Sequence, residues 1–184
     1  MRRIASWLVR LIAAGLGLAA IGLAAAQPRV AAEAELKAAF VYRIALFVEW
    51  PAEPFGSAAP FQVCVLGSDA GWSAAFAPIE GKKVQGRPVA PVRLLARVDE
   101  ARGCQVVVFA DADVRRAAAL PGPVLTVGDA DGFAQAGGMV GFVREGTQLR
   151  FDINRDAAAR AQLRLPAELL KVARAVIDSG GVRP

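Results

Sequence analysis

The chain has 184 residues, of which 55% are hydrophobic and 21% charged, and its formal net charge at neutral pH is +5. It contains no histidine and two cysteines, which excludes Ser-His-Asp and Cys-His catalysis, histidine-containing zinc sites and a four-cysteine zinc site. No dense stretch of lysine and arginine indicates binding to nucleic acid. The serines stand in neither a G-x-S-x-G nor an S-x-x-K setting. We therefore predict a protein that is not an enzyme, with no catalytic residue, cofactor or metal.

Residues 1–26 have the three parts of a secretory signal peptide. A basic start at Met1–Arg3 is followed by a mostly apolar run, Leu11–Leu23, and then by the small residues Ala24–Ala26. The run is short and rich in alanine and glycine for a membrane span, and a retained N-terminal anchor is the alternative. Cleavage would remove three arginines, lower the net charge from +5 to +2 and leave residues 27–184 in a periplasm.

The mature chain is long enough for one domain with a hydrophobic core. Its first predicted element is a helix over Ala31–Trp50, which Pro51 ends. An apolar stripe on this helix consists of Leu36, Phe40, Ile44, Phe47 and Val48. We interpret the stripe as core rather than as a docking face. Trp50 is interpreted as a lid on the core, the alternative being a contact with another protein.

Short apolar runs separated by turns predict the elements that follow. In chain order they are a strand at Phe61–Leu66, a short helix from about Asp69 to Ala77, a turn with an edge strand within Lys82–Leu95, a strand at Gln105–Ala110, a helix at Val114–Leu120 and a strand at Val124–Val127. Two of these strands, Gln105–Ala110 and Val124–Val127, show no alternation of polar and apolar residues. We expect them to be neighbouring interior strands.

The last third of the chain predicts a β-hairpin and two helices. The hairpin strands are Met139–Val143 and Gln148–Asn154; Asn154 would cap a helix over Arg155–Leu163, and Pro166 would open a last helix with the stripe Leu169, Val172, Ala173 and Val176. Arg150, Asp152 and Asn154 share one face of the second hairpin strand, and solvation or helix capping would explain them. The pattern predicts the α/β class, as a three-layer sandwich with a mixed central sheet flanked by helices.

The two cysteines lie close to predicted strands. Cys64 is within one strand, and Cys104 immediately precedes another. In an oxidising compartment an even pair is more often a structural bridge than a reactive site. We predict a disulfide between Cys64 and Cys104, the alternative being two buried free thiols.

Two loops that follow strands are candidates for a small-molecule site. Gly67–Gly71 could present backbone N–H groups to an anion, and Val127–Phe133 lies at the end of the strand predicted at Val124–Val127. Tight turns are the plainer interpretation of both. Asp129–Gly132 resembles a fragment of a calcium loop, but the EF-hand frame would place Val127 and Gly138 where acids are required. We predict a polar turn there rather than a metal site.

Six blocks of sequence run in order along the mature chain. They are LKAAFVYRIALFVEWP (Leu36–Pro51), CVLG (Cys64–Gly67), GCQVVVF (Gly103–Phe109), LTVGDADGFAQAGGMVGFV (Leu125–Val143), LRFDIN (Leu149–Asn154) and LLKVARAV (Leu169–Val176). Together they resemble the YfiR-like periplasmic proteins, whose best-known members repress a membrane-bound diguanylate cyclase. Some relatives have a second cysteine pair near the hairpin, which this chain lacks, so redox behaviour that depends on that pair is not implied.

The resemblance implies a periplasmic regulatory protein with an α/β fold that forms a homodimer. Its partner would be a membrane-bound diguanylate cyclase or sensor kinase, contacted through the periplasmic segment of that enzyme. Repression of a cyclase would lower cyclic-di-GMP and biofilm formation. The alternative is a periplasmic small-molecule sensor or binding protein that uses the two loops. No nucleic-acid partner is expected, and the processed chain would not itself span the membrane.

Overall fold

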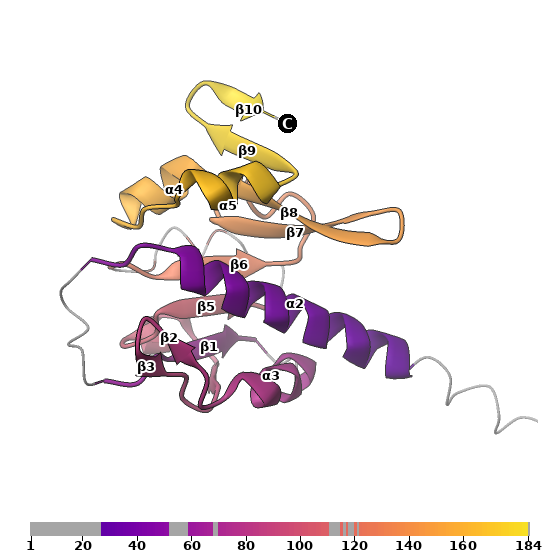
Figure 1. Ribbon diagram of the computed structural model, residues 1–184, viewed down its shortest axis with the longest axis vertical. Coiled ribbons are helices and arrows are strands. Elements are labelled where there is room, and N and C mark those ends of the chain that lie inside the picture. The colour runs from indigo at the N-terminus through magenta and orange to yellow at the C-terminus, as the bar shows by residue number, and fades with distance from the viewer. Residues whose placement is uncertain are drawn as a thin grey trace, which may run out of the picture.

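The computed structural model describes residues 27–51, 59–67, 70–110, 115, 117, 120 and 122–183. The predicted signal peptide, residues 1–26, and most of the helix predicted at Val114–Leu120 lie outside these residues. The elements, labelled in Figure 1, are α2 (Gln27–Phe47), β1 (Val63–Leu66), α3 (Ala70–Phe76), η1 (Ala77–Ile79), β2 (Lys83–Val84), β3 (Arg87–Pro88), β4 (Arg93–Leu95), η2 (Val98–Ala101), β5 (Val106–Phe109), β6 (Leu125–Gly128), β7 (Val140–Glu145), β8 (Gln148–Asn154), α4 (Arg155–Arg160), α5 (Ala167–Val172), β9 (Ala175–Asp178) and β10 (Gly181–Arg183).

An eight-stranded mixed sheet organises the described part of the chain. Its strand order is β10-β9-β8-β7-β6-β5-β1-β4, and β2 and β3 form a separate two-stranded ribbon. Strands β4, β1, β5, β6 and β7 are mutually parallel, whereas β8 is antiparallel to β7 and β10 is antiparallel to β9. The predicted α/β class with a mixed central sheet is confirmed. The expected pairing of two interior apolar strands is also confirmed, because β5 and β6 are neighbours.

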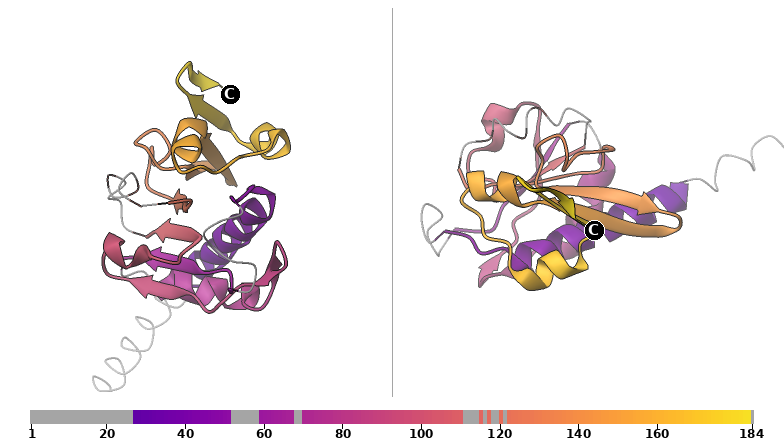
Figure 2. Two further views of the ribbon diagram at one scale, coloured as in Figure 1. Left: turned by 90° about the vertical axis from the view of Figure 1, so that its left-hand side faces the viewer. Right: turned by 90° about the horizontal axis from the view of Figure 1, so that it is seen from above.

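The two faces of the sheet are covered differently. On one face, α2 and α3 pack over Val63 and Val65 of β1, and α5 joins the same core through Leu169. On the other face, Cys64 and Leu66 point into a second core that includes Ala101 of η2. Figure 2 shows α2 and α5 on one side of the sheet and η2 on the other. Among the helices of the described ranges, none is long and apolar enough to cross a membrane.

The first helix starts and ends earlier than the helix predicted at Ala31–Trp50, and it turns a different face toward the sheet. α2 ends at Phe47, and its buried face is formed by Ala38, Val41, Ile44, Ala45 and Val48. Leu36 and Phe47 were expected in the core, but their exposed fractions are 47% and 51%. The prediction was wrong for these two residues because α2 is apolar on nearly all sides, so hydrophobicity alone does not reveal which face meets the sheet.

Trp50 is on the core side, as expected. Its ring packs edge-on against Phe61, with ring centroids 5.5 Å apart. Its indole N–H donates a hydrogen bond to the carbonyl of Ala45 at 3.4 Å. The ring therefore closes the end of the core where α2 stops.

The prediction of the last helix was wrong for its second half, which is not helical. α5 ends at Val172, and Ala173 has an extended backbone. Val176, placed on the helix stripe by its spacing, instead lies in β9 and pairs with Ile153 of β8. The β-branched residues of β9 fit the sheet, and pairing with a strand more than twenty residues away overrides the local helical spacing.

Asp152 and Asn154 are buried rather than solvated. Asn154 has the predicted role, because its side-chain oxygen accepts a hydrogen bond from the Ala157 N–H at 2.8 Å and caps α4. Asp152 is 0% exposed and accepts hydrogen bonds from the Arg174 guanidinium at 2.8 and 2.6 Å. Solvation is therefore the wrong explanation for Asp152, whose charge is balanced across the sheet by a residue just before β9.

Candidate functional site

The predicted cysteine pair is bonded in the structure. Cys64 lies in β1, in register with Arg93 of β4 and Val107 of β5, and Cys104 stands two residues before β5. The two Cα atoms are 5.9 Å apart, within the range that a disulfide requires. Both residues are 0% exposed. The bridge joins β1 to the segment that leads into the neighbouring strand β5. It lies inside the second core, where it has no access to solvent.

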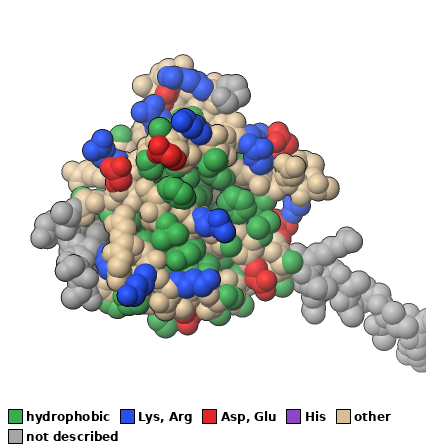
Figure 3. Space-filling view, viewed as in Figure 1, with side chains coloured by type: hydrophobic (Ala, Val, Ile, Leu, Met, Phe, Trp, Pro, Cys, Tyr) green, Lys and Arg blue, Asp and Glu red, His purple; other side chains and the backbone are tan. Residues whose placement is uncertain are grey.

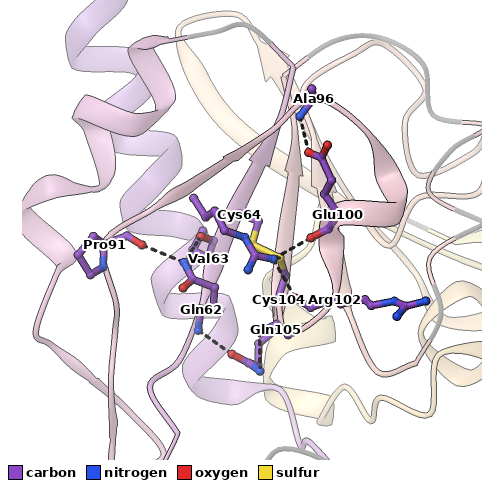
Figure 4. The surroundings of a disulfide bond; sticks show 11 residues. Gln62, Val63, Cys64, Pro91, Ala96, Glu100, Arg102, Cys104 and Gln105 are labelled. Carbon is purple, nitrogen blue, oxygen red and sulfur yellow. Dashed lines mark hydrogen bonds between the residues drawn. A yellow bond between two sulfur atoms is a disulfide. The ribbon is translucent and has the colours of Figure 1, made fainter.

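Polar side chains surround the bridge at the amino ends of these strands (Figure 4). One nitrogen of the Arg93 guanidinium donates to the carbonyls of Glu100 and Arg102, each at 2.8 Å, and to the Cys104 sulfur at 3.0 Å. The side-chain oxygen of Gln105 accepts from the Gln62 N–H at 2.6 Å. These bonds fix the segment that carries Cys104 against β1 and β4. The arrangement is that of a structural bridge rather than an exposed, exchangeable one.

The loop predicted as a possible ligand site, Val127–Phe133, is filled by its own side chain. The Phe133 ring lies so close to Gly128 and Gly138 that a Cβ atom on either glycine would overlap it. Phe133 is itself 2% exposed and packs on Phe109, with ring centroids 5.5 Å apart. The two glycines therefore serve close packing, and the loop offers no hollow at this point. Of the other candidate loop, Ser68 and Asp69 lie outside the described residues.

Asp129, at the start of the predicted polar turn, is part of an ion-pair network. The Lys37 ammonium of α2 lies 2.7 Å from an Asp129 oxygen and 2.9 Å from a Glu33 oxygen, and Glu33 also pairs with Arg144 of β7. Burial lowers the pKa of Lys37, but hydrogen bonds to Asp129 and Glu33 outweigh it and raise the pKa overall. The Lys37 hydrogen bond lowers the pKa of Glu33. The network attaches α2 to the loop after β6 and to the hairpin.

No group of three His, Cys, Asp or Glu side chains that could hold a metal ion occurs within the ranges that the structure covers. A pocket of about 130 Å³ lies at the amino ends of β6 and β7, lined by residues that include Thr126, Met139 and Arg160. This volume is well below the roughly 300–1,000 Å³ of typical drug-sized ligand sites. The pocket could take only a small compound, and it lies away from the two loops that the sequence singled out.

The feature best suited to recognition is an exposed apolar surface on α2 and α5. Leu36, Leu46 and Phe47 of α2 are 47%, 42% and 51% exposed, and Val172 of α5 is 58% exposed. Figure 3 shows hydrophobic side chains running across the middle of this face between basic side chains. Contiguous exposed apolar side chains with a charged border are typical of protein-binding surfaces. We call Leu36, Leu46, Phe47 and Val172 the apolar surface.

Sequence reasoning named Leu36 and Phe47 but assigned them to the core. The signal that could have corrected it is the presence of Ala39 and Leu46 on the side opposite the buried positions. A helix with apolar residues on both sides has more apolar surface than one sheet can cover.

A comparison with protein families identifies the chain. A sequence model of the YfiR/HmsC-like family matches residues 34–174, which is most of the chain and runs from α2 to the residue before β9. No curated protein matches the sequence. The chain belongs to the YfiR/HmsC-like family, a family of regulatory rather than catalytic proteins.

Proposed function

We propose that this YfiR/HmsC-like protein is a periplasmic regulator that binds the periplasmic region of a membrane signalling enzyme. The partner is a membrane-bound diguanylate cyclase, which the protein represses and whose cyclic-di-GMP output it lowers. The family match over residues 34–174 carries the proposal, because the best-known members of the family have this role. The apolar surface supports assembly with another protein chain, which in this proposal is a second copy.

Export is part of the same proposal. Residues 1–26 act as a signal peptide that is cleaved before Gln27, and residues 27–184 form the periplasmic domain, which assembles as a homodimer. The basic start, the apolar run and the small residues before the cleavage point support this assignment. N-terminal sequencing of protein from the periplasmic fraction should give Gln27. Intact Met1 in a membrane fraction would contradict it.

The regulatory role is tested by deletion of the gene in the native strain. Loss of the repressor should raise cyclic-di-GMP and biofilm formation, and the full-length gene should restore both. A gene for residues 27–184 without a signal should fail to restore them, whereas the same residues behind an unrelated export signal should succeed. Unchanged cyclic-di-GMP in the deletion strain, with the candidate cyclase expressed, would reject the proposal.

Identification of the partner uses the same strains. Protein purified from solubilised membranes should carry a cyclase with a periplasmic segment. Recovery of a sensor kinase instead would keep the regulatory role and change the enzyme that is regulated. Recovery of neither, together with a small compound in the pocket at Thr126 and Met139, would favour the sensor function.

A further inference from the structure

The outward face of α2 carries a regular stripe. Leu36, Phe40, Arg43 and Phe47 follow one another at spacings of four, three and four residues, so on an α-helix they lie within one narrow arc. Leu36 and Phe47 at its ends are about half exposed, Phe40 is partly buried and Arg43 is exposed. The side of the helix that carries Ala38, Val41 and Ala45 covers the sheet. The Phe40 ring also packs edge-on against Phe142 and Phe151 of its own protomer, so only part of it faces outward. We call these four residues the α2 stripe.

The spacing of the α2 stripe is the same when it is read from either end. Two copies of α2 packed antiparallel about a twofold axis would therefore place Leu36 of one copy against Phe47 of the other. Phe40 of one copy would face Arg43 of the other. Alternating spacings of three and four are those at which packed helices interlock their side chains. A second copy of the chain necessarily brings a matching stripe, whereas an unrelated partner would need one by coincidence.

The one charge in the stripe fits this pairing. The Arg43 guanidinium makes no ion pair or hydrogen bond within the described part of the chain. In the antiparallel pair it would lie over the Phe40 ring of the other copy, where a guanidinium is attracted to the aromatic face. A stable interface buries roughly 800 Å² on each partner. The helices α2 and α5 lie on the same side of the sheet (Figure 2). Leu46 of α2 and Val172 of α5, which are 42% and 58% exposed, would add to the area that the stripe supplies.

We propose that the α2 stripe is the homodimer interface, in which two α2 helices pack antiparallel with Leu36 opposite Phe47 and Phe40 opposite Arg43. This proposal rests on the homodimer of the proposed function and names the surface that forms it. It leaves the cyclase-binding surface to other parts of the molecule.

The first experiment measures the dimer dissociation constant of the mature chain by sedimentation. Leu36→Lys and Phe47→Glu should each weaken the dimer at least about thirtyfold. Both positions are exposed in the protomer, so circular dichroism and the melting temperature should remain close to those of the unmodified chain. Val182→Lys, at a 58% exposed position on β10, is the matched control and should leave the dimer intact.

The second experiment tests the antiparallel register. The double variant Leu36→Lys with Phe47→Glu should return the dissociation constant to within about tenfold of the unmodified value, because the introduced lysine of one copy would face the introduced glutamate of the other. The two positions are about 16 Å apart along one helix, so the new charges cannot pair within a chain. A double variant that stays as weak as the single variants would overturn the register.

A failure of the α2 interface can be distinguished from a failure of the proposed repressor role. A mature chain that is monomeric, or a dimer that neither single substitution weakens, overturns the α2 interface whatever the effect on cyclic-di-GMP. A dimer with the expected responses, in a strain whose cyclic-di-GMP does not change on deletion, supports the interface and rejects the repressor role.

Discussion

The two halves of the sheet are held together by different means. The parallel half, β4-β1-β5-β6, has the Cys64–Cys104 disulfide between β1 and the segment that leads into β5. The C-terminal half, β7-β8-β9-β10, has instead the ion pair between Asp152 and Arg174, with nitrogen and oxygen 2.6 Å apart. One half is fixed by a covalent bond whose strength does not depend on solvent. The other depends on a buried charge that stabilises only while its partner is present.

The disulfide should give the largest effect on stability. It closes a loop with a sequence separation of 40 residues, for which the chain-entropy estimate is roughly 4 kcal/mol. Cys64→Ser with Cys104→Ser should lower the free energy of unfolding by about that amount, measured by urea denaturation. The protein should also become less abundant in the periplasm. Two free thiols, found by mass spectrometry in protein taken directly from cells, would show that the bridge does not form there.

Replacing either partner of the ion pair in the C-terminal half should lower the free energy of unfolding, but by different amounts. The Asp152 side chain is 1% exposed and that of Arg174 is 35% exposed, so only Arg174 can be hydrated when it is left alone. Arg174→Ala should therefore cost about 3 kcal/mol, and Asp152→Asn roughly half of that. Urea denaturation measures both, and hydrogen exchange should show β9 and β10 opening first. Equal losses would mean that burial of Asp152 is not what makes the pair important.

The same contrast explains what could be predicted from the sequence. β1, β5 and β6 were found because each is a short apolar run buried on both faces, a signal present in the residues themselves. Val176 in β9 was missed because its pairing with Ile153 is a long-range property that the helical spacing concealed. The roles of Leu36 and Phe47 were missed for a related reason, since the orientation of α2 is decided by its contacts. The Cys64–Cys104 pair followed from the oxidising compartment that the signal sequence indicates.

The boundary between the two halves depends on close packing. Gly128 ends β6 and Gly138 lies just before β7, and the Phe133 ring fills the space where side chains at both positions would be. Gly138→Ala should lower the free energy of unfolding by about 2 kcal/mol, as expected for an overpacked core. Adding Phe133→Leu, which removes the ring, should recover part of the loss. If the second substitution makes the loss larger, then contact with Phe133 is not its cause.

The smallest expected effect concerns the ion-pair network that joins the two halves of the sheet. In this network Lys37 binds Asp129, which follows β6, and Glu33 binds Arg144 of β7. The hydrogen bond and charge of Lys37 hold the pKa of Glu33 below its ordinary value of 4.5. A carboxyl whose pKa is lowered by folding stabilises the protein above its unfolded pKa, and the contribution is lost as the pH falls through the folded pKa.

Glu33→Gln should therefore reduce the free energy of unfolding at neutral pH by about 0.5–1 kcal/mol, since the Glu33 side chain is one-third exposed and solvent screens the pair. The difference from the unmodified chain should vanish once the pH is well below 4.5, where Glu33 is protonated in both states. Glu35→Gln, at an exposed position on the same helix, is the matched control and should change stability little at any pH. A difference that persists in acid would mean that Glu33 acts through packing, and that its charge does not couple the two halves.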